Sequence, residues 1–337
     1  MNRIKILGAG LVCIDVVHAG ENTIIMNGGS CANVLSVLSQ IGFDCSIIRE
    51  RYGDGYEQIL STTLTSLGVQ EIIYKSTRAD TPKIIECLSS GRHEFYTICP
   101  ECGKKLLNLK LPTEHDYDSV SSTINDVNVF YCDRVSSGIR MIMDSIREKK
   151  GIVIFEPNSA RNVAALYEAT KHADIVKFSK DRIPMSLAEK IRIGENTVSL
   201  IICTEGESGL SYSYRMENGE MSSWKFVKSL FADPIVDTSG AGDWLTAGFL
   251  SELFKHNKLS ILGILRDEKE IKDMLGQGMK YSQICCAAIG AQGVFYSEEY
   301  KKNFSWLNEK DIPDSFAPIN SDKLNKPGVC SMCLSVG

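Results

Sequence analysis

Short apolar runs alternate along the chain with longer stretches in which apolar residues recur at helical spacing. Runs of strand length lie at 128–132, 152–155, 175–178 and 198–203, and a further short strand is expected at 233–237. Helical patterns cover 138–149, 163–172 and 244–254. Strands that alternate with helices of about 10–15 residues indicate βαβ units and a mainly parallel sheet with helices on both faces. Ligands of such sheets bind at the C-terminal ends of the strands.

The helical pattern is absent between residues 72 and 98. Apolar runs at 82–88 and 93–98 flank Ser-Ser-Gly-Arg. Two strand-like runs separated by a short turn that contains glycine indicate a β-hairpin. We therefore expect a β-hairpin in this part of the chain, with no helix beside it.

Composition limits the class of protein. With 337 residues, 43% of them hydrophobic, the chain can bury one large α/β core with a smaller unit attached. The net charge of −5 argues against nucleic acid as a partner, because surfaces that bind nucleic acid are basic. Asp15 interrupts the apolar N-terminal stretch, and no run of about 18 apolar residues follows. We expect a cytoplasmic protein that does not enter a membrane.

The most informative segment is 237–248, which reads Asp-Thr-Ser-Gly-Ala-Gly-Asp-Trp-Leu-Thr-Ala-Gly. It places a glycine-rich turn and a carboxylate where a strand gives way to a helix. Gly240 and Gly242 remove side chains that would keep a ligand away, and the N–H groups of the first helical turn then point at the ligand. The helix dipole favours an anion there, and Asp243 in the same turn would stand beside it as a general base. The segment predicts a site that transfers a phosphoryl group.

This segment resembles the C-terminal signature of the ribokinase-like carbohydrate kinases, the PfkB family. By that resemblance, Asp243 deprotonates a substrate hydroxyl, and Gly240, Ala241 and Gly242 form an anion hole for the γ-phosphate of ATP. The resemblance implies a ribokinase-like fold, with a three-layer α/β/α core, a mainly parallel sheet and a small β-sheet lid. It also implies ATP and Mg²⁺ as cofactors and leaves the use of a monovalent cation open.

A second stretch, from Gly28 to Gly42, resembles the N-terminal signature of the same family. There, a turn at Gly28 and Gly29 precedes a helix whose Asn33 hydrogen-bonds sugar hydroxyls. Asp15 matches the family's other substrate-binding acid. Asp133 matches, by position alone, a further acid that contacts substrate in some relatives.

The resemblance covers roughly residues 4 to 295. The segment Thr-x-Gly-x-x-Gly at Thr204, Gly206 and Gly209 matches the part of the family that lines the nucleotide phosphates. The hairpin expected above, within segment 72–103, would join segment 12–27 as the lid that closes over the sugar. In this family the lid often serves for dimerisation, so a homodimer through the lid is an open expectation.

Two positions depart from the family pattern. The usual Asp-Pro-Asn is Glu-Pro-Asn here, beginning at Glu156. The usual Asn-x-x-Glu, which helps to order magnesium and water near the phosphates, falls on 179–182, Ser-Lys-Asp-Arg. The missing glutamate predicts either that metal handling shifts to Glu156 or Asp181, or that activity is reduced.

The chain has 12 cysteines, and four of them form two Cys-x-x-Cys units: Cys99, Cys102, Cys330 and Cys333. This spacing lets two thiolates hold one tetrahedral ion, whereas disulfides are not expected in the cytoplasm. We expect one structural Zn²⁺ to join the pairs and to fasten a tail at 306–337 to the lid of a kinase domain at 1–305. Reduced thiols and a redox switch are the alternatives.

Several functions are compatible with these observations. A kinase for a small sugar or sugar derivative is favoured, and a nucleoside kinase of the same fold uses nearly the same residues. A catalytically weak regulatory protein that contains zinc is a third interpretation, but Asp243 and the complete glycine turn argue against it. Gly8-Ala-Gly10 could suggest a dinucleotide site, yet Cys13 occupies the position of the third glycine.

Overall fold

The computed structural model describes residues 3–89, 92–230, 235–255, 261–297, 319–320 and 329–335. Its larger sheet is formed by β1 (Lys5–Ala9), β4 (Asp44–Arg51), β5 (Val69–Ser76), β8 (Val129–Cys132), β9 (Ile152–Phe155), β10 (Ile175–Ser179), β11 (Leu200–Thr204), β12 (Gly209–Tyr214) and β13 (Lys225–Lys228). The strand order is β13-β12-β11-β10-β9-β8-β1-β4-β5. All pairs from β5 to β11 are parallel, and the pairs β11–β12 and β12–β13 are antiparallel, so β12 alone among these strands runs against the others.

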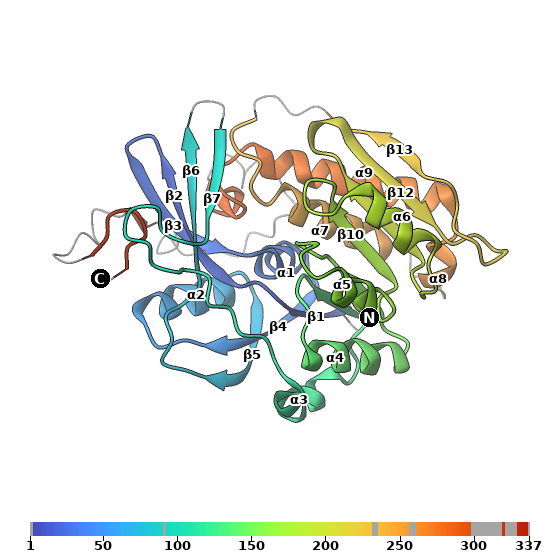
Figure 1. Cartoon of the computed structure of the whole chain (residues 1–337), viewed down its shortest axis with the longest axis horizontal. Helices are drawn as coiled ribbons and strands as arrows, with labels where there is room; N and C mark the ends of the chain where they lie inside the picture. Colours follow the sequence, from blue (N-terminus) through green and yellow to red (C-terminus); the bar gives the residue numbers. More distant parts are fainter. Residues whose placement is uncertain are drawn as a thin grey trace.

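Helices cover both faces of this sheet (Figure 1). They are α1 (Ser30–Gln40), α2 (Gly55–Ser66), α3 (Glu114–Ser121), α4 (Ser137–Glu148), α5 (Val163–Thr170), α6 (Met185–Ile193), α7 (Ala241–Leu253), α8 (Ile261–Ile264) and α9 (Glu268–Cys286). Side chains alternate between the faces of a strand, so Tyr131 of β8 packs into one core cluster and Phe130 into the other. Helices α1, α2, α7, α8 and α9 belong to the first cluster, and α3 to α6 to the second. The predicted three-layer fold is confirmed.

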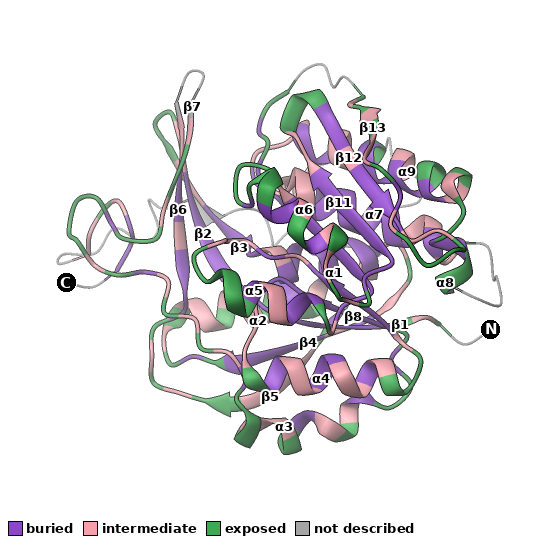
Figure 2. Cartoon of the chain, turned by 45° about the vertical axis from the view of Figure 1, so that its right-hand side comes forward, coloured by how far each residue is buried: buried purple, intermediate pink, exposed green. Residues whose placement is uncertain are grey.

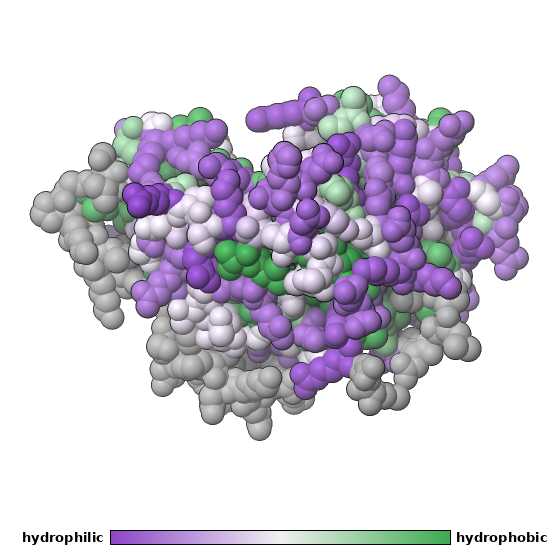
Figure 3. All heavy atoms as spheres, turned by 90° about the horizontal axis from the view of Figure 1, so that it is seen from below, coloured by the Kyte–Doolittle hydropathy of each residue, from purple (hydrophilic) through white to green (hydrophobic). Residues whose placement is uncertain are grey.

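The larger sheet is buried along most of its strands, whereas α5 and α6 expose one side to solvent (Figure 2). On the face seen from below, hydrophilic residues surround a narrow apolar band (Figure 3). Within the described ranges, none of the helices combines the length and apolarity that a bilayer crossing requires.

The strand predicted at 233–237 is wrong for those of its residues that the structure describes. Residues 233–234 lie outside the described residues, and 235–237 form no strand. The N–H groups of Val236 and Asp237 both donate to the carbonyl oxygen of Cys286, at 2.8 and 3.3 Å, instead of entering a strand ladder. The segment is therefore anchored on the end of α9, and α7 begins at Ala241, earlier than the sequence pattern indicated.

A second, smaller sheet stands beside the core, at the upper left of Figure 1. Its strands are β2 (Cys13–Ala19), β3 (Asn22–Gly28), β6 (Lys83–Ser89), β7 (Arg92–Tyr96) and β14 (Ile319–Asn320). Their order is β14-β3-β2-β6-β7, so the expected small sheet is present, but residues 72–76 of the expected lid segment 72–103 belong to β5 of the larger sheet. Strand β14 was not predicted, and it pairs with the outer edge of β3.

The register of β2 against β6 sorts their side chains into two faces. Asp15 pairs with Ile84 and Val17 with Glu86, so Asp15 and Glu86 share one face. Ile14 pairs with Lys83, which places Lys83 on the opposite face. Of the tail expected at 306–337, only 319–320 and 329–335 are among the described residues.

Candidate active site

A left-handed backbone and close packing both favour glycine in the turn before α7. Gly240 is the N-cap of the helix and has a φ of 76°, in the left-handed region. A Cβ at Gly240 would lie 2.3 Å from the Cβ of Ala291. Gly242 has more room than Gly240 and polar neighbours: a Cβ at Gly242 would lie 3.5 Å from Nζ of Lys177 and 4.0 Å from Oε1 of Glu156. The first turn of α7 therefore faces a pair of charged side chains.

Asp243 lies in that first turn and its side chain is buried. Nδ2 of Asn33 donates to Oδ2 of Asp243 at 2.7 Å, and Nε2 of Gln292 donates to Oδ1 of Asn33 at 3.2 Å. Burial raises the pKa of Asp243 to about 6, with a further rise from the negative charge of Glu156, while the hydrogen bond from Asn33 opposes the shift. The carboxyl is thus poised to hold or release a proton near neutral pH.

Asp15 approaches the same region from the lid. Sγ of Cys13 donates to Oδ1 of Asp15 at 3.3 Å. Burial raises the pKa of Asp15 well above its usual range, and the negative charges of Glu86, Asp243 and Asp237 add to the rise. The carboxyl groups of Asp15, Glu86, Asp237 and Asp243 therefore lie close enough for the charge of one to shift the pKa of another.

Close approach explains two glycines of the N-terminal signature. A Cβ at Gly28 would lie 1.7 Å from Oδ2 of Asp15. Gly29, the N-cap of α1, has a φ of 94°, and its Cβ would lie 2.4 Å from the carbonyl oxygen of Leu11. Neither position can hold another residue while Asp15 and Leu11 keep their places.

Asp133 follows β8 and is also buried. Its Oδ1 accepts the N–H of Leu11 at 2.8 Å, and its Oδ2 accepts a hydrogen bond from Arg134 at 2.9 Å. Strand β1 lies between β8 and β4, and the strand order reverses direction at β1. Asp133 therefore sits at a switch point of the sheet, where ligands of doubly wound folds bind.

Glu156 and Lys177 form an ion pair beside the glycine turn, in which Lys177 is buried and Glu156 is partly exposed. Nζ of Lys177 donates to Oε1 of Glu156. Oε2 of Glu156 accepts hydrogen bonds from the hydroxyl groups of Tyr131, at 3.1 Å, and Thr246, at 3.0 Å. Asp181, the other acid considered for metal handling, is exposed. Lys177 was missed by sequence reasoning, although it is a charged residue inside the apolar run 175–178.

A contact between lid and turn was also missed. Oγ of Ser239 donates to Oε2 of Glu86 at 2.9 Å. The ring of His93 bridges two acids, with Nε2 3.4 Å from Oε2 of Glu86 and Nδ1 3.3 Å from Oδ1 of Asp237. Burial alone would lower the pKa of His93, but the hydrogen bond to Glu86 and the charges of Asp237 and Glu86 outweigh it and raise the pKa. When it is protonated, the His93 ring links Glu86 of the lid to Asp237, which precedes the glycine turn.

The residues expected to line the nucleotide lie after β11. Thr204 ends that strand, Gly206 has a φ of 58°, and Gly209 has a φ of 131°. A Cβ at Gly209 would lie 2.2 Å from the carbonyl oxygen of Val227. The segment sits at the C-terminal end of a parallel strand, on the ligand-binding edge of the sheet.

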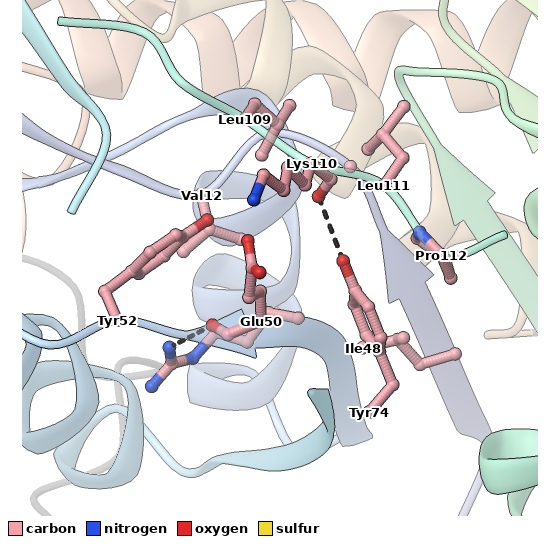
Figure 4. A pocket seen from close by; sticks show the side chains of 11 residues that line it. Val12, Ile48, Glu50, Tyr52, Tyr74, Leu109, Lys110, Leu111 and Pro112 are labelled. Carbon is pink, nitrogen blue, oxygen red and sulfur yellow. Dashed lines mark hydrogen bonds between the residues drawn. The ribbon is translucent and has the colours of Figure 1, made fainter. Parts of the chain in front are cut away.

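A small cavity lies apart from these residues, beside β4 (Figure 4). The Glu50 carboxylate and the Lys110 amine point into it, and the Tyr74 hydroxyl donates to the Lys110 carbonyl oxygen at 3.0 Å. Its volume of about 10 Å³ is room for roughly one water molecule. It is too small for a sugar and does not belong to the site.

The two Cys-x-x-Cys units meet in space, as the sequence predicted. Sγ of Cys99 lies 3.7 Å from Sγ of Cys330, and Sγ of Cys102 lies 3.6 Å from Sγ of Cys333. All four sulfur atoms lie within 4.8 Å of one another.

Comparison with known proteins agrees with the fold and with the signatures. A family model described as pfkB family carbohydrate kinase matches residues 10–297. Probable fructokinase-5 of Arabidopsis thaliana is 23% identical over 288 residues, which are 78% of this chain and 83% of the relative. Fructokinase of Salmonella typhimurium is 22% identical, over 74% of this chain and 84% of the relative.

Solved structures with the same fold have low sequence identity to this chain. Adenosine kinase from Schistosoma mansoni aligns with a TM-score of 0.70 at 15% identity, over 85% of this chain and 96% of its own. Ribokinase from Giardia lamblia aligns with a TM-score of 0.70 at 14% identity, over 86% and 95%. Fructokinase from Xylella fastidiosa, with bound ATP, gives 0.68 at 16% identity, over 85% and 93%.

Proposed function

The chain belongs to the pfkB family of carbohydrate kinases, which are ATP-dependent, and from this premise we propose that it phosphorylates a hydroxyl group of a small sugar of the fructose type. The curated relatives described above are fructokinases, and they match 78% and 74% of this chain. The observation that carries the proposal is the buried Asp243, held by Asn33 at the start of α7.

In the proposed reaction, Asp243 takes the proton of the attacking sugar hydroxyl. Its raised pKa of about 6 leaves the carboxylate ionised at neutral pH and basic enough to accept a proton. The hydrogen bond from Asn33 fixes which way the carboxylate faces. The N–H groups of Gly240, Ala241 and Gly242 stabilise the charge that spreads over the transferred phosphoryl group.

Charge beside the turn supports the same chemistry. Lys177 is only 3% exposed and lies on the side of Gly242, so its charge acts at short range in a poorly solvated place. Bound Mg²⁺ neutralises phosphate charge in reactions of this kind. Glu156, with the Tyr131 and Thr246 hydroxyls, is the oxygen-rich group next to the turn and would hold the ion's water shell.

The acceptor would lie between lid and core. Asp15 and Asn33 would bind its hydroxyl groups, and Gly28 and Gly29 would leave room for it. Asp133 hydrogen-bonds Leu11 and Arg134, so we assign it to positioning the β1–β2 connection beside the acceptor. For the nucleotide we propose Thr204, Gly206 and Gly209, whose backbone lies at the end of β11.

A nucleoside kinase is the second candidate. The Phe95 side chain is exposed on the lid and its ring centroid lies 4.2 Å from that of His93. An aromatic surface at that place could stack on a nucleobase. A homodimer through the lid stays a prediction, and it could not use the edge of β3, because β14 occupies it.

The test is ADP release from Mg·ATP with a panel of fructose, other hexoses, pentoses, sugar acids, sugar phosphates and adenosine, with and without K⁺. We expect turnover with a sugar acceptor. Asp243→Asn should lower kcat by about 10²–10⁴-fold, the contribution of a general base. The control is Asp118→Asn, because Asp118 is an exposed acid in α3. Turnover with adenosine alone would favour the second candidate, and an unimpaired Asp243→Asn would refute the assigned base.

A further inference from the structure

We propose that Cys99, Cys102, Cys330 and Cys333 bind one structural Zn²⁺ as four thiolates, and that this ion fastens the end of the chain to the back of the lid. The site lies on a different face of the lid from Asp15 and Glu86, and the proposal does not depend on the kinase activity. Figure 1 shows the red C-terminal segment beside the loop that follows β7.

The distances between the sulfur atoms fit a tetrahedral zinc ion. Zn–S bonds of about 2.3 Å at tetrahedral angles place sulfur atoms about 3.8 Å apart. The sulfur atoms of Cys99 and Cys330 are 3.7 Å apart, those of Cys102 and Cys333 are 3.6 Å apart, and all four lie within 4.8 Å of one another. These separations are much longer than the roughly 2.05 Å of a disulfide bond. The four thiols therefore already surround a space of the size of one ion.

The two Cys-x-x-Cys turns have the same backbone geometry. In the first, the Gly103 N–H donates to the Cys99 carbonyl oxygen at 2.9 Å, and the Cys99 N–H to the Lys104 carbonyl oxygen at 2.9 Å. In the second, the Leu334 N–H donates to the Cys330 carbonyl oxygen at 2.8 Å, and the Cys330 N–H to the Ser335 carbonyl oxygen at 3.0 Å. The hydrogen bonds connect equivalent positions, so the turns are two copies of one structure.

The residue after the second cysteine of each turn confirms this equivalence. Gly103 has a φ of 70°, and Leu334 has a φ of 54°. Leucine in this left-handed conformation costs roughly 1–2 kcal/mol relative to glycine. A residue keeps a conformation of that cost only where its surroundings require it. A metal ion bound by both Cys-x-x-Cys turns would hold Leu334 in this conformation.

Backbone N–H groups face the sulfur atoms in both turns. The N–H groups directed at sulfur are those of Glu101 and Cys102 toward Cys99, Lys104 toward Cys102, and Met332 and Cys333 toward Cys330. Four thiolates and one Zn²⁺ leave a net charge of −2, and four protons are released when the ion binds. Lys83 lies near Cys333, and Lys104 near Cys102 and Cys333, so two cations lie beside that charge.

The tail that carries the second turn contacts both lid and core. Nε2 of His18 in β2 lies 2.8 Å from the Met332 carbonyl oxygen. The Leu334 carbonyl oxygen accepts hydrogen bonds from Tyr56 of α2, at 2.8 Å, and from Lys83 of β6, at 3.4 Å. A zinc ion that fixes residues 330–333 would therefore hold together the lid strands and the start of α2.

The test uses the full, untagged chain purified without chelator. We expect elemental analysis to find one zinc ion per chain, and X-ray absorption to show about four sulfur ligands at about 2.3 Å. Cys330→Ser combined with Cys333→Ser should lose the metal and release the tail to proteolysis. Cys87→Ser is the matched control, because Cys87 lies in β6 of the same lid outside the cluster, and it should keep the zinc.

Three results would overturn the proposal. The first is a metal-free wild-type chain, whether its four thiols titrate freely or are oxidised to disulfides. The second is a metal shell of nitrogen and oxygen, or iron in place of zinc. The third is zinc that stays bound at full occupancy in the Cys330→Ser, Cys333→Ser variant. The measurements on the wild-type chain decide the question even if that variant fails to fold.

Discussion

Asp243→Asn should lower kcat by about 10²–10⁴-fold and at the same time make the folded protein more stable. Burial and the charge of Glu156 raise the pKa of Asp243 to about 6, which means that the fold disfavours the ionised carboxylate. Asparagine has the same shape, carries no charge, and can accept the hydrogen bond from Asn33 through its carbonyl oxygen. The substitution removes the electrostatic cost and keeps the contact.

The size of the effect follows from the two pKa values. The pKa rises from 3.8 to about 6 on folding. A carboxyl with a raised folded pKa destabilises the protein increasingly as the pH rises from the unfolded to the folded pKa, and by a constant amount above it. At about 1.4 kcal/mol per unit, the cost at pH 7 is about 3 kcal/mol, and at pH 5 it falls to roughly half of that, because native Asp243 is then mostly protonated.

Urea unfolding of wild type and Asp243→Asn at both pH values measures this cost, with tryptophan fluorescence as the signal because Trp244 is fully buried. The variant should be the more stable protein at pH 7, and its advantage should shrink by about half at pH 5. Asp181→Asn, at an exposed position, should change stability by less than about 0.5 kcal/mol. A destabilised Asp243→Asn, or an advantage independent of pH, would refute the electrostatic reasoning.

Three further results are expected. The kcat/KM for the sugar should fall tenfold per pH unit below about 6, because protonated Asp243 cannot accept the substrate proton; a flat profile down to pH 5 would contradict this. Gly240→Ala should lower kcat at least tenfold, because the new Cβ would clash with Ala291. Gly42→Ala is the control: Gly42 also has a positive φ but has open space around it, so the substitution should cost only roughly 1–2 kcal/mol of stability and leave kcat unchanged. His93→Gln should raise the sugar KM several-fold at pH 6 and less at pH 8.5, because the His93 ring bonds Glu86 most strongly when it is protonated, and its raised pKa favours protonation at low pH. The same ratio of variant KM to wild-type KM at both pH values would contradict a charged bridge.

Much of the site could be predicted because its chemistry is encoded in short segments. The order strand, glycine turn, acid and helix is a local pattern, and 237–248 contains all of the groups that make up the turn. The alternation of apolar runs predicted the layers, because each run has to bury one or both faces. The Cys-x-x-Cys spacing likewise predicted which thiols meet.

The parts of the site that could not be predicted depend on strand register and on packing between segments that are distant in the sequence. Lys177 meets Glu156 because β9 and β10 are neighbours in a particular register, which no local pattern specifies. His93 reaches Asp237 only once the lid folds over the turn. The segment at 235–237 shows the opposite failure, since its apolar sequence indicated a strand but its N–H groups bond to the end of α9.

The most direct test of the central claim is the fate of the γ-phosphate of ATP. Wild type and Asp243→Asn would be incubated with Mg·ATP and fructose, and ³¹P NMR would follow sugar phosphate, ADP and inorganic phosphate together. Wild type should form one sugar phosphate for each ADP, and Asp243→Asn should form almost none. ADP formed with inorganic phosphate and no phosphorylated sugar, or equal rates in the two proteins, would contradict the central claim.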